Sequence, residues 1–298
     1  MHILKSTNNM LYTCRRLARQ WMLLFLLLGF TQLALATEKG IFWKLESPSG
    51  ITSYLFGTMH TDDNRVTDFS PNVLHALNSV DLFMMEVQQS RDTSALMLKE
   101  GNLAQFLTDK EFEQVRALAD FHVMHLGATL QMKPWLLAVI FDLPEPQTPF
   151  AQDNLLMTKS EGLLKDVEGI ETSKEHFGIM DSFSMEEQMI MLRAVLKRSQ
   201  EQKERDFEKL MSAYLAGDSD KITKLDEKIT GGMLPNEIWK KMRQKLLDDR
   251  NVVMAERTIA AANQRPTFIA VGASHLSGDN GLIAAFKKAG FKLSPIRQ

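Results

Sequence analysis

Short apolar runs of strand character alternate with stretches of helical spacing along most of the chain. Apolar and polar side chains alternate over residues 41–47, and Pro48-Ser49-Gly50 forms a turn signal before a second run at residues 52–56. This pattern predicts a β-hairpin at the start of the folded part.

The remaining periodicities predict strands and helices in turn. We expect further strands at residues 80–87, 165–170, 267–271 and 291–295. Helical spacing covers residues 71–79, 96–141, 153–162, 174–198, 199–230, 239–264 and 281–289, with a new start at Lys133-Pro134-Trp135, because proline suits the first turn of a helix. The alternation predicts an α/β fold in which a central mixed sheet is flanked by helices.

Two peptides far apart in the chain share one pattern. Each is an apolar strand-like run that stops at a glycine and presents a histidine three residues later, as Gly57 to His60 and as Gly272 to His275. A glycine lets the chain leave a strand at a sharp angle, and ligands bind at the carboxyl ends of such strands. The repetition predicts two related halves, each with a strand ending in Gly-x-x-His, and one site shared by His60 and His275.

Carboxylates occur at two other predicted strand ends. Glu86 closes the run at 80–87, and Glu171 comes directly after the run at 165–170. Two imidazoles and one or two carboxylates suit Zn, Mn, Co or Fe(II) with open positions for water, which predicts metal-assisted hydrolysis of an amide or ester. The alternatives are that Glu86 pairs with a surface cation and that Glu171 belongs to a helix start.

Arg250 has two interpretations, and the remaining four histidines of the chain's folded part have a structural one. Arg250 either holds a substrate carboxylate or oxyanion in its planar fork or pairs locally with Asp248, Asp249 or Glu256, and the local pairing is slightly favoured. No His-Glu-x-x-His, Walker-type loop, Gly-x-Gly-x-x-Gly or Gly-x-Ser-x-Gly is present in the sequence. Structural roles are predicted for His75, His122, His125 and His176.

The first 36 residues have a different composition from the rest. Four basic residues precede an apolar run from Trp21 to Phe30, and Ala34-Leu35-Ala36 then offers a small-x-small cleavage site. We therefore predict a secretory signal at 1–36 and one α/β domain at 37–298. The alternative is a membrane anchor formed by the uncleaved residues 21–36, although this apolar stretch is short for a spanning helix.

Export limits the chemistry of the mature domain. The only cysteine, Cys14, lies in the signal, so histidines and carboxylates must supply any metal ligands. The signal has four basic residues and no acidic one, so its removal changes the formal net charge from −2 to −6. A mildly acidic exported domain is a poor candidate for nucleic acid binding.

The chain resembles the TraB/GumN/Tiki family from about Ile41 to Pro295. The matching residues are Phe56-Gly57-Thr58-Met59-His60, the strand closing in Glu86, Lys133-Pro134-Trp135, Glu171-Thr172, Arg250-Asn251 and the stretch from Val271 to Leu282. The last motif, Val-Gly-Ala-Ser-His-Leu-x-Gly-x-x-Gly-Leu, is the most specific. Residues 167–170, which precede Glu171, depart from the usual Gly-Leu-Glu-Thr pattern.

The resemblance implies an α/β fold related to the erythromycin-esterase and ChaN-like proteins, and metal-dependent peptide cleavage of the kind associated with Tiki members. Mn or Co would be the ion, with Zn retained from the ligand chemistry. By the same resemblance, His60 and His275 are metal-binding or catalytic, Glu86 is the associated carboxylate, and Arg250 is a site arginine.

These observations support three functional hypotheses. The first is an exported, metalloprotease-like hydrolase that cleaves peptides or protein amino termini, with His60, His275 and Glu86 as metal ligands and Glu86, Arg250 and Glu171 as catalytic residues. The second is a metal-independent esterase or hydrolase that uses a histidine as general base. The third is a non-catalytic protein that binds a peptide, as in pheromone shutdown, or assists polysaccharide assembly.

Overall fold

The structure is a computed structural model that describes residues 39–88 and 92–297. The predicted signal at 1–36 lies outside these residues. None of the helices in the described ranges is both long enough and apolar enough to cross a membrane. The residues from Lys39 onwards form one compact unit.

A six-stranded mixed sheet organises this unit, as predicted. The strand order is β4-β3-β5-β2-β1-β6. Strands β4, β3, β5 and β2 are parallel to one another, whereas β1 is antiparallel to both β2 and β6. Their bounds are Phe42–Glu46 for β1, Thr52–Thr58 for β2, Leu82–Val87 for β3, Asp166–Glu171 for β4, Thr267–Gly272 for β5 and Lys292–Pro295 for β6.

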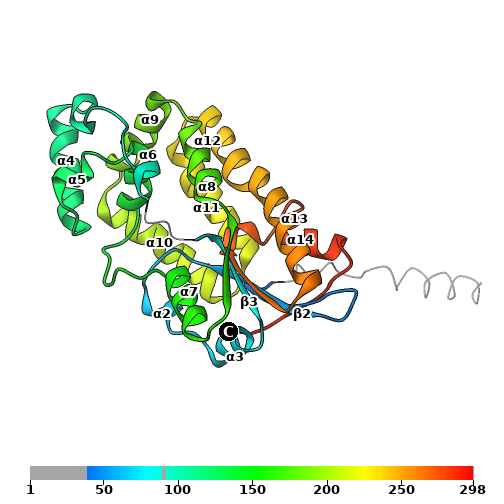
Figure 1. Ribbon diagram of the computed structural model, residues 1–298. Helices are drawn as coiled ribbons and strands as arrows, with labels where there is room; N and C mark the ends of the chain where they lie inside the picture. Colours follow the sequence, from blue (N-terminus) through cyan, green and yellow to red (C-terminus); the bar gives the residue numbers. More distant parts are fainter. Residues whose placement is uncertain (1–38, 89–91, 298) are drawn as a thin grey trace, which may run out of the picture. The chain divides into compact units, whose positions relative to one another are not determined.

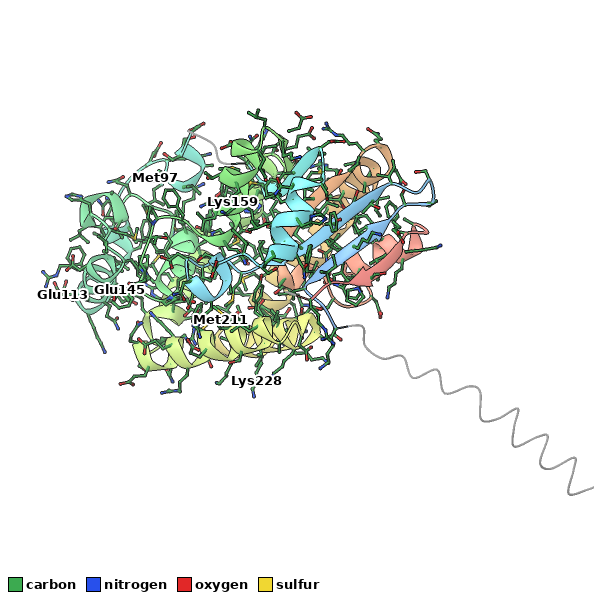
Figure 2. The ribbon with its side chains drawn as sticks, turned by 90° about the horizontal axis from the view of Figure 1, so that it is seen from below. Met97, Glu113, Glu145, Lys159, Met211 and Lys228 are labelled. Atoms are coloured by element: carbon green, nitrogen blue, oxygen red, sulfur yellow. The ribbon has the colours of Figure 1, made fainter. Side chains whose placement is uncertain are left out.

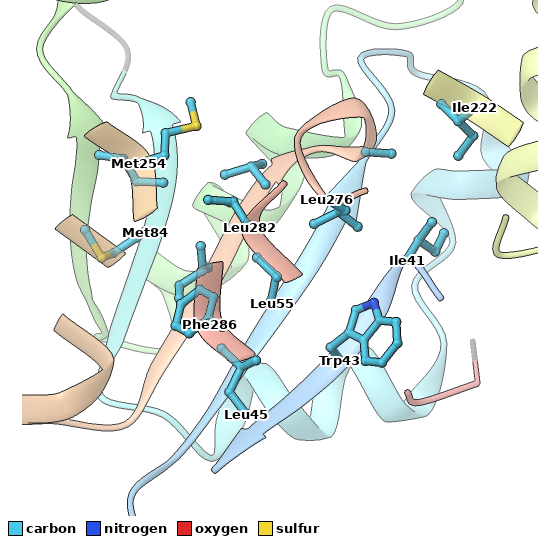
Figure 3. Close-up of a cluster of buried hydrophobic side chains, with 14 of the residues drawn as sticks. Ile41, Trp43, Leu45, Leu55, Met84, Ile222, Met254, Leu276, Leu282 and Phe286 are labelled. Atoms are coloured by element: carbon cyan, nitrogen blue, oxygen red, sulfur yellow. The ribbon is translucent and has the colours of Figure 1, made fainter. Parts of the chain in front are cut away.

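Both faces of the sheet are covered, which explains why its central strands are apolar at nearly every position. Alternate side chains of the strands enter two separate cores. One core contains Trp43, Leu55 and Met84 together with residues of α10 (Gln200–Leu215), α11 (Ser219–Met233), α13 (Asp249–Gln264) and α14 (Leu282–Lys288), and Figure 3 shows part of it. The other contains Phe56, Phe83 and Phe268 with residues of α3 (Pro71–Asn78) and α7 (Gln152–Gly162).

A third core lies within a group of helices. Leu137, Phe141 and Leu192 are fully buried in it, and α6 packs against α9. Figure 1 shows α4, α5, α6 and α9 gathered together, away from the labelled strands β2 and β3. The bounds are Asp109–Phe121 for α4, Leu126–Thr129 for α5, Pro134–Phe141 for α6, Ser173–Asp181 for α8 and Met185–Leu196 for α9, and the short α2 is Asn64–Thr67.

The charged segment at 199–230 forms two helices, α10 and α11, as the pattern indicates. Each buries one apolar stripe and exposes the rest, so that Met211 is fully buried while Lys228 is exposed. In Figure 2, Lys228 points outwards from these yellow helices and Met211 lies on their inner side.

The helix predicted at 239–264 is interrupted by a wider turn. Helix α12 (Asn236–Arg243) continues into a π-helical turn at Gln244–Asp248, and α13 starts directly after it. Such turns are rare and occur frequently at functional sites. The sheet and helices confirm the α/β prediction, whereas the division into two related halves stays a prediction.

Candidate functional site

The four parallel strands direct their carboxyl ends to one edge of the sheet. His60 lies just beyond β2, Glu86 is next to last in β3, Glu171 ends β4, and His275 lies beyond β5 in a 3₁₀ turn at Ala273–His275. The strand register aligns Thr58 with Gly272 and Val87 with Glu171, so these ends are level. All the residues predicted at strand ends therefore lie along one edge.

The two motif glycines allow close approach rather than a sharp exit from a strand. Gly57 lies inside β2, and a Cβ there would come within 2.6 Å of Leu276 Cδ1 and 3.1 Å of Ala273 Cα. At Gly272 a Cβ would lie 3.1 Å from Glu86 Oε1, and the Gly272 amide donates to that oxygen over 2.6 Å. The first glycine thus admits the second motif, and the second glycine admits Glu86.

Arg250 is the centre of a buried charged cluster. Its Nη2 donates to Glu86 Oε2 over 2.5 Å and to Glu171 Oε2 over 2.8 Å, and its Nε donates to Glu171 Oε1 over 3.0 Å. Nη1 donates to the Leu246 carbonyl, 3.2 Å away in the π-helical turn. All three nitrogens of the guanidinium donate to protein acceptors, and the turn before α13 helps to orient it.

This arrangement keeps both carboxylates ionised. Burial alone would raise the pKa of Glu86, but the charge and hydrogen bond of Arg250 and the Gly272 amide hold it well below its usual range. Burial likewise opposes ionisation of Glu171, and the hydrogen bonds of His176 and Arg250 lower its pKa. Two carboxylates beside one guanidinium leave a net negative charge at this end of the sheet.

His275 is neutral in its surroundings. Burial lowers its pKa to about 4, and only 7% of the side chain is exposed. Its Nδ1–H donates to Asn251 Oδ1 over 2.6 Å, so the lone pair is on Nε2, which lies 3.3 Å from Arg250 Nη1 and 3.7 Å from Glu86 Oε1. A neutral imidazole oriented by a hydrogen bond on its other nitrogen is the form that accepts a proton or binds a metal.

His176 lies in the cluster, a position that was not predicted from the sequence, where only a structural role was expected for it. Its Nδ1 lies 3.0 Å from Glu171 Oε2 and 3.2 Å from Arg250 Nη2. Glu86, Glu171 and His176 each offer one ligand atom, and these atoms lie within 4.8 Å of one another. The three residues could hold a metal ion.

The donor types fit a divalent cation, since oxygen and imidazole ligands suit Mn, Co and Zn. Arg250 Nη2 contacts Glu86, Glu171 and His176, so that an ion held by all three has to displace this end of the guanidinium. The predicted ligand set was different, because it combined Glu86 with His60 and His275. In the described part of the chain, neither histidine is in the three-residue group.

His60 lies in separate surroundings at the end of β2. Its Nδ1 is 3.0 Å from Asp153 Oδ2, and 72% of its side chain is exposed. The hydrogen bond with Asp153 raises the pKa of His60, and the charge of Glu86 acts in the same direction, which places His60 within electrostatic reach of the cluster. His60 and His275 therefore share the edge of the sheet but have different partners.

The contacts of three residues at the site, Arg250, Asp153 and His176, were not predicted from the sequence. Arg250 pairs with Glu86 and Glu171, so the favoured local pairing with Asp248, Asp249 or Glu256 is wrong. Asp153 was missed because it resembles an ordinary acidic residue in the first turn of a helix. His176 had one available signal, since it lies five residues after strand-ending Glu171 and α8 has a Thr172 capping box that fixes the helix start.

The fold and this edge define an α/β protein with a dense group of ionisable side chains at the carboxyl ends of parallel strands. The chain belongs to the TraB/PrgY/gumN family, whose sequence model matches residues 41–295. Searches of the curated proteins and of the solved structures returned no match. The family resemblance noted in the sequence is thereby confirmed over residues 41–295.

Proposed function

We propose that this protein is an exported hydrolase that cleaves amide bonds in peptides or at protein amino termini, with a divalent ion held by Glu86, Glu171 and His176. The observation that carries the proposal is the convergence of their ligand atoms within 4.8 Å at the carboxyl edge of the sheet. Mn, Co and Zn match this mixed oxygen and nitrogen set, and when bound such an ion polarises a scissile carbonyl.

The chain's own residues supply orientation and proton transfer. His275 is buried and neutral, with Nε2 accepting from Arg250 Nη1 over 3.3 Å, while His60 lies at the exposed side of the same edge. Arg250 keeps the carboxylates ionised through its hydrogen bonds. If a bound ion displaced the Nη2 end of the guanidinium, the positive charge of Arg250 would be beside the negative charge that develops on a substrate oxygen.

The test is metal analysis combined with cleavage of a peptide library by the wild type and Glu86→Gln. The wild type should bind about one Mn²⁺, Co²⁺ or Zn²⁺, and the substitution should reduce both binding and cleavage by at least about 100-fold, because it removes a charged ligand. Glu168→Gln is the matched control, since Glu168 is on β4 and pairs on the surface with Arg265. Absence of any ion in metal-soaked wild type would contradict the metal-dependent proposal.

One observation supports a metal-independent hydrolase as the second candidate. Arg250 already bridges Glu86 and Glu171, and His60 already has a carboxylate partner. In that case His60 or His275 is the general base that activates water. Full activity in the presence of a chelator favours this candidate. If the library is not cleaved at all, a non-catalytic role in peptide binding or polysaccharide assembly is the better explanation.

The proposed place of action is the periplasm or the exterior, after cleavage of residues 1–36. The alternative is attachment to the membrane by residues 21–36. The length of the mature amino terminus, measured by mass spectrometry of the exported protein, distinguishes the two.

A further inference from the structure

His60 has an exposed imidazole whose Nδ1 is fixed by a mostly buried carboxylate. The His60 side chain is 72% exposed, whereas that of Asp153 is 14% exposed. The second oxygen of Asp153 accepts a hydrogen bond from the Thr58 hydroxyl on the last residue of β2. Both carboxylate oxygens therefore have protein partners, and the orientation of the carboxylate is fixed on two sides.

The segment that carries His60 is fixed to α7 by a second, buried set of contacts. The Met59 amide donates to Gln152 Oε1 over 2.9 Å, and the Gln152 side-chain amide donates to the Val66 carbonyl over 2.7 Å. The Tyr214 hydroxyl donates to the Gly57 carbonyl over 2.8 Å. Gln152 and Tyr214 are each 1% exposed. The neighbours of His60 and Asp153 in the chain are thus held by buried groups on three elements.

This geometry determines which ring nitrogen of His60 is available. An ionised carboxylate only accepts hydrogen bonds, so Nδ1 must carry the hydrogen that faces Asp153 Oδ2. Nε2, on the other side of an exposed ring, then carries the lone pair. An isolated imidazole on a surface has no such constraint on its tautomer.

We propose that Asp153 is the positioning residue of His60, which it holds in the Nδ1–H tautomer so that Nε2 accepts a proton from water at the site. The inference rests on the proposed hydrolase function. As the water oxygen bonds to the substrate carbonyl carbon, the O–H bond breaks and its proton passes to Nε2. The imidazolium keeps its Nδ1 hydrogen bond with Asp153, and the Nε2 proton passes to the amide nitrogen as the carbon–nitrogen bond breaks, which releases the amine and leaves the carboxylic acid.

The test compares the full chain with Asp153→Asn, using ¹⁵N-histidine NMR in mildly alkaline buffer and the His60→Gln spectrum to assign the His60 signals. Thr58 donates to Oδ1, so an asparagine keeps its oxygen there and presents its NH₂ to His60. Nδ1 then becomes the acceptor, and the tautomer should change from Nδ1–H to Nε2–H. Asp62→Asn is the matched control, because Asp62 bonds the Gln147 amide and not His60. Its His60 signals should match the wild type.

Kinetics supply the second measurement, with a library peptide that the wild type cleaves. Asp153→Asn should lower kcat by about 10²–10⁴-fold, the range for loss of a base or its orientation, with KM changed less than about threefold. An Nε2–H tautomer in the wild type, an unchanged tautomer in Asp153→Asn, or an unchanged kcat would overturn the proposal. Absence of peptide cleavage by the wild type contradicts the hydrolase, while the NMR result still decides whether Asp153 fixes His60.

Discussion

The edge of the sheet contains two charged groups that differ in burial and in the number of their partners. In one, Arg250 is buried and joins Glu86 and Glu171, and the neutral His275 lies against them. In the other, His60 is exposed and has one fixed partner, Asp153. Each group contains the histidine of a Gly-x-x-His motif. Similar local sequences therefore place one imidazole in a buried position and the other in an exposed position.

The difference comes from the path of the chain beyond each strand. After β5 the chain makes a 3₁₀ turn that buries Ala273, His275 and Leu276. After β2 it continues into the short α2, and His60 is left uncovered. In the buried group the free energy of the site depends on mutual charge compensation, whereas in the other group water can solvate the exposed ring of His60. The two groups should therefore respond differently to the loss of one member.

The largest effect should come from Arg250→Met, which leaves Glu86 and Glu171 buried without a cation. We expect a loss of about 3–5 kcal/mol in the free energy of unfolding, the range for breaking a buried ion pair from one side. Mn²⁺ should restore part of this loss, because it replaces the missing charge on the same carboxylates. Urea unfolding with and without Mn²⁺ is the measurement.

The control for this prediction is Arg257→Met on the same helix. Arg257 pairs with Glu175 at the surface, where it is 39% exposed, and it donates to the Ile170 carbonyl. We expect a loss of about 1 kcal/mol that Mn²⁺ does not restore. Equal losses in the two variants would show that the buried group is not held together by charge compensation.

The strands of both groups could be predicted from the sequence, because apolar periodicity reports which positions a sheet buries. The edge shared by His60, Glu86, Glu171 and His275 could be inferred from the strand ends alone. The pairing across the edge could not be predicted. Arg250 reaches Glu86 and Glu171 through tertiary contacts, and local acids next to it in the sequence were the more obvious partners.

The glycines illustrate the same limit. The sequence draws attention to Gly57 and Gly272, and the expected role of each was to let the chain leave its strand at a sharp angle. The structure gives a packing reason instead, namely space for Leu276 and for Glu86 Oε1. Such contacts form between segments that meet only after folding, so they cannot be predicted from the periodicity of the sequence.

A third histidine shows the effect of burial on an imidazole when one ring nitrogen has no hydrogen-bond partner. His122 is 7% exposed and stacks against Phe141, but its Nε2 is buried without a hydrogen-bond partner. Burial lowers its pKa to about 4, compared with about 6.5 for an ordinary histidine. Between these two pH values the unfolded chain binds a proton that the folded chain does not, so this residue lowers stability as the pH falls from about 6.5 to about 4.

Replacement by His122→Phe should remove that part of the acid sensitivity, which amounts to up to about 3 kcal/mol at pH 4. The difference in unfolding free energy between variant and wild type should grow steadily as the pH falls through this window, as measured by urea unfolding at several pH values. His75→Gln, on the exposed surface of α3, controls for the loss of an imidazole elsewhere. A difference that stays constant with pH would mean that burial of His122 does not disfavour its charged form.

The smallest effects should distinguish the two motif glycines. Gly57→Ala places a methyl group against Leu276 Cδ1 and the backbone of Ala273, and we expect a loss of about 1–2 kcal/mol from overpacking. Gly272 has an ordinary φ of −52°, and its nearest obstacle is Glu86 Oε1 at 3.1 Å, so Gly272→Ala should change stability by less than about 1 kcal/mol.

The Gly272→Ala substitution should instead move Glu86 and weaken Mn²⁺ binding several-fold, whereas Gly57→Ala should leave binding nearly unchanged. Urea unfolding and Mn²⁺ titration of both variants test this, and a reversed order would place the first glycine, rather than the second, beside the charged group.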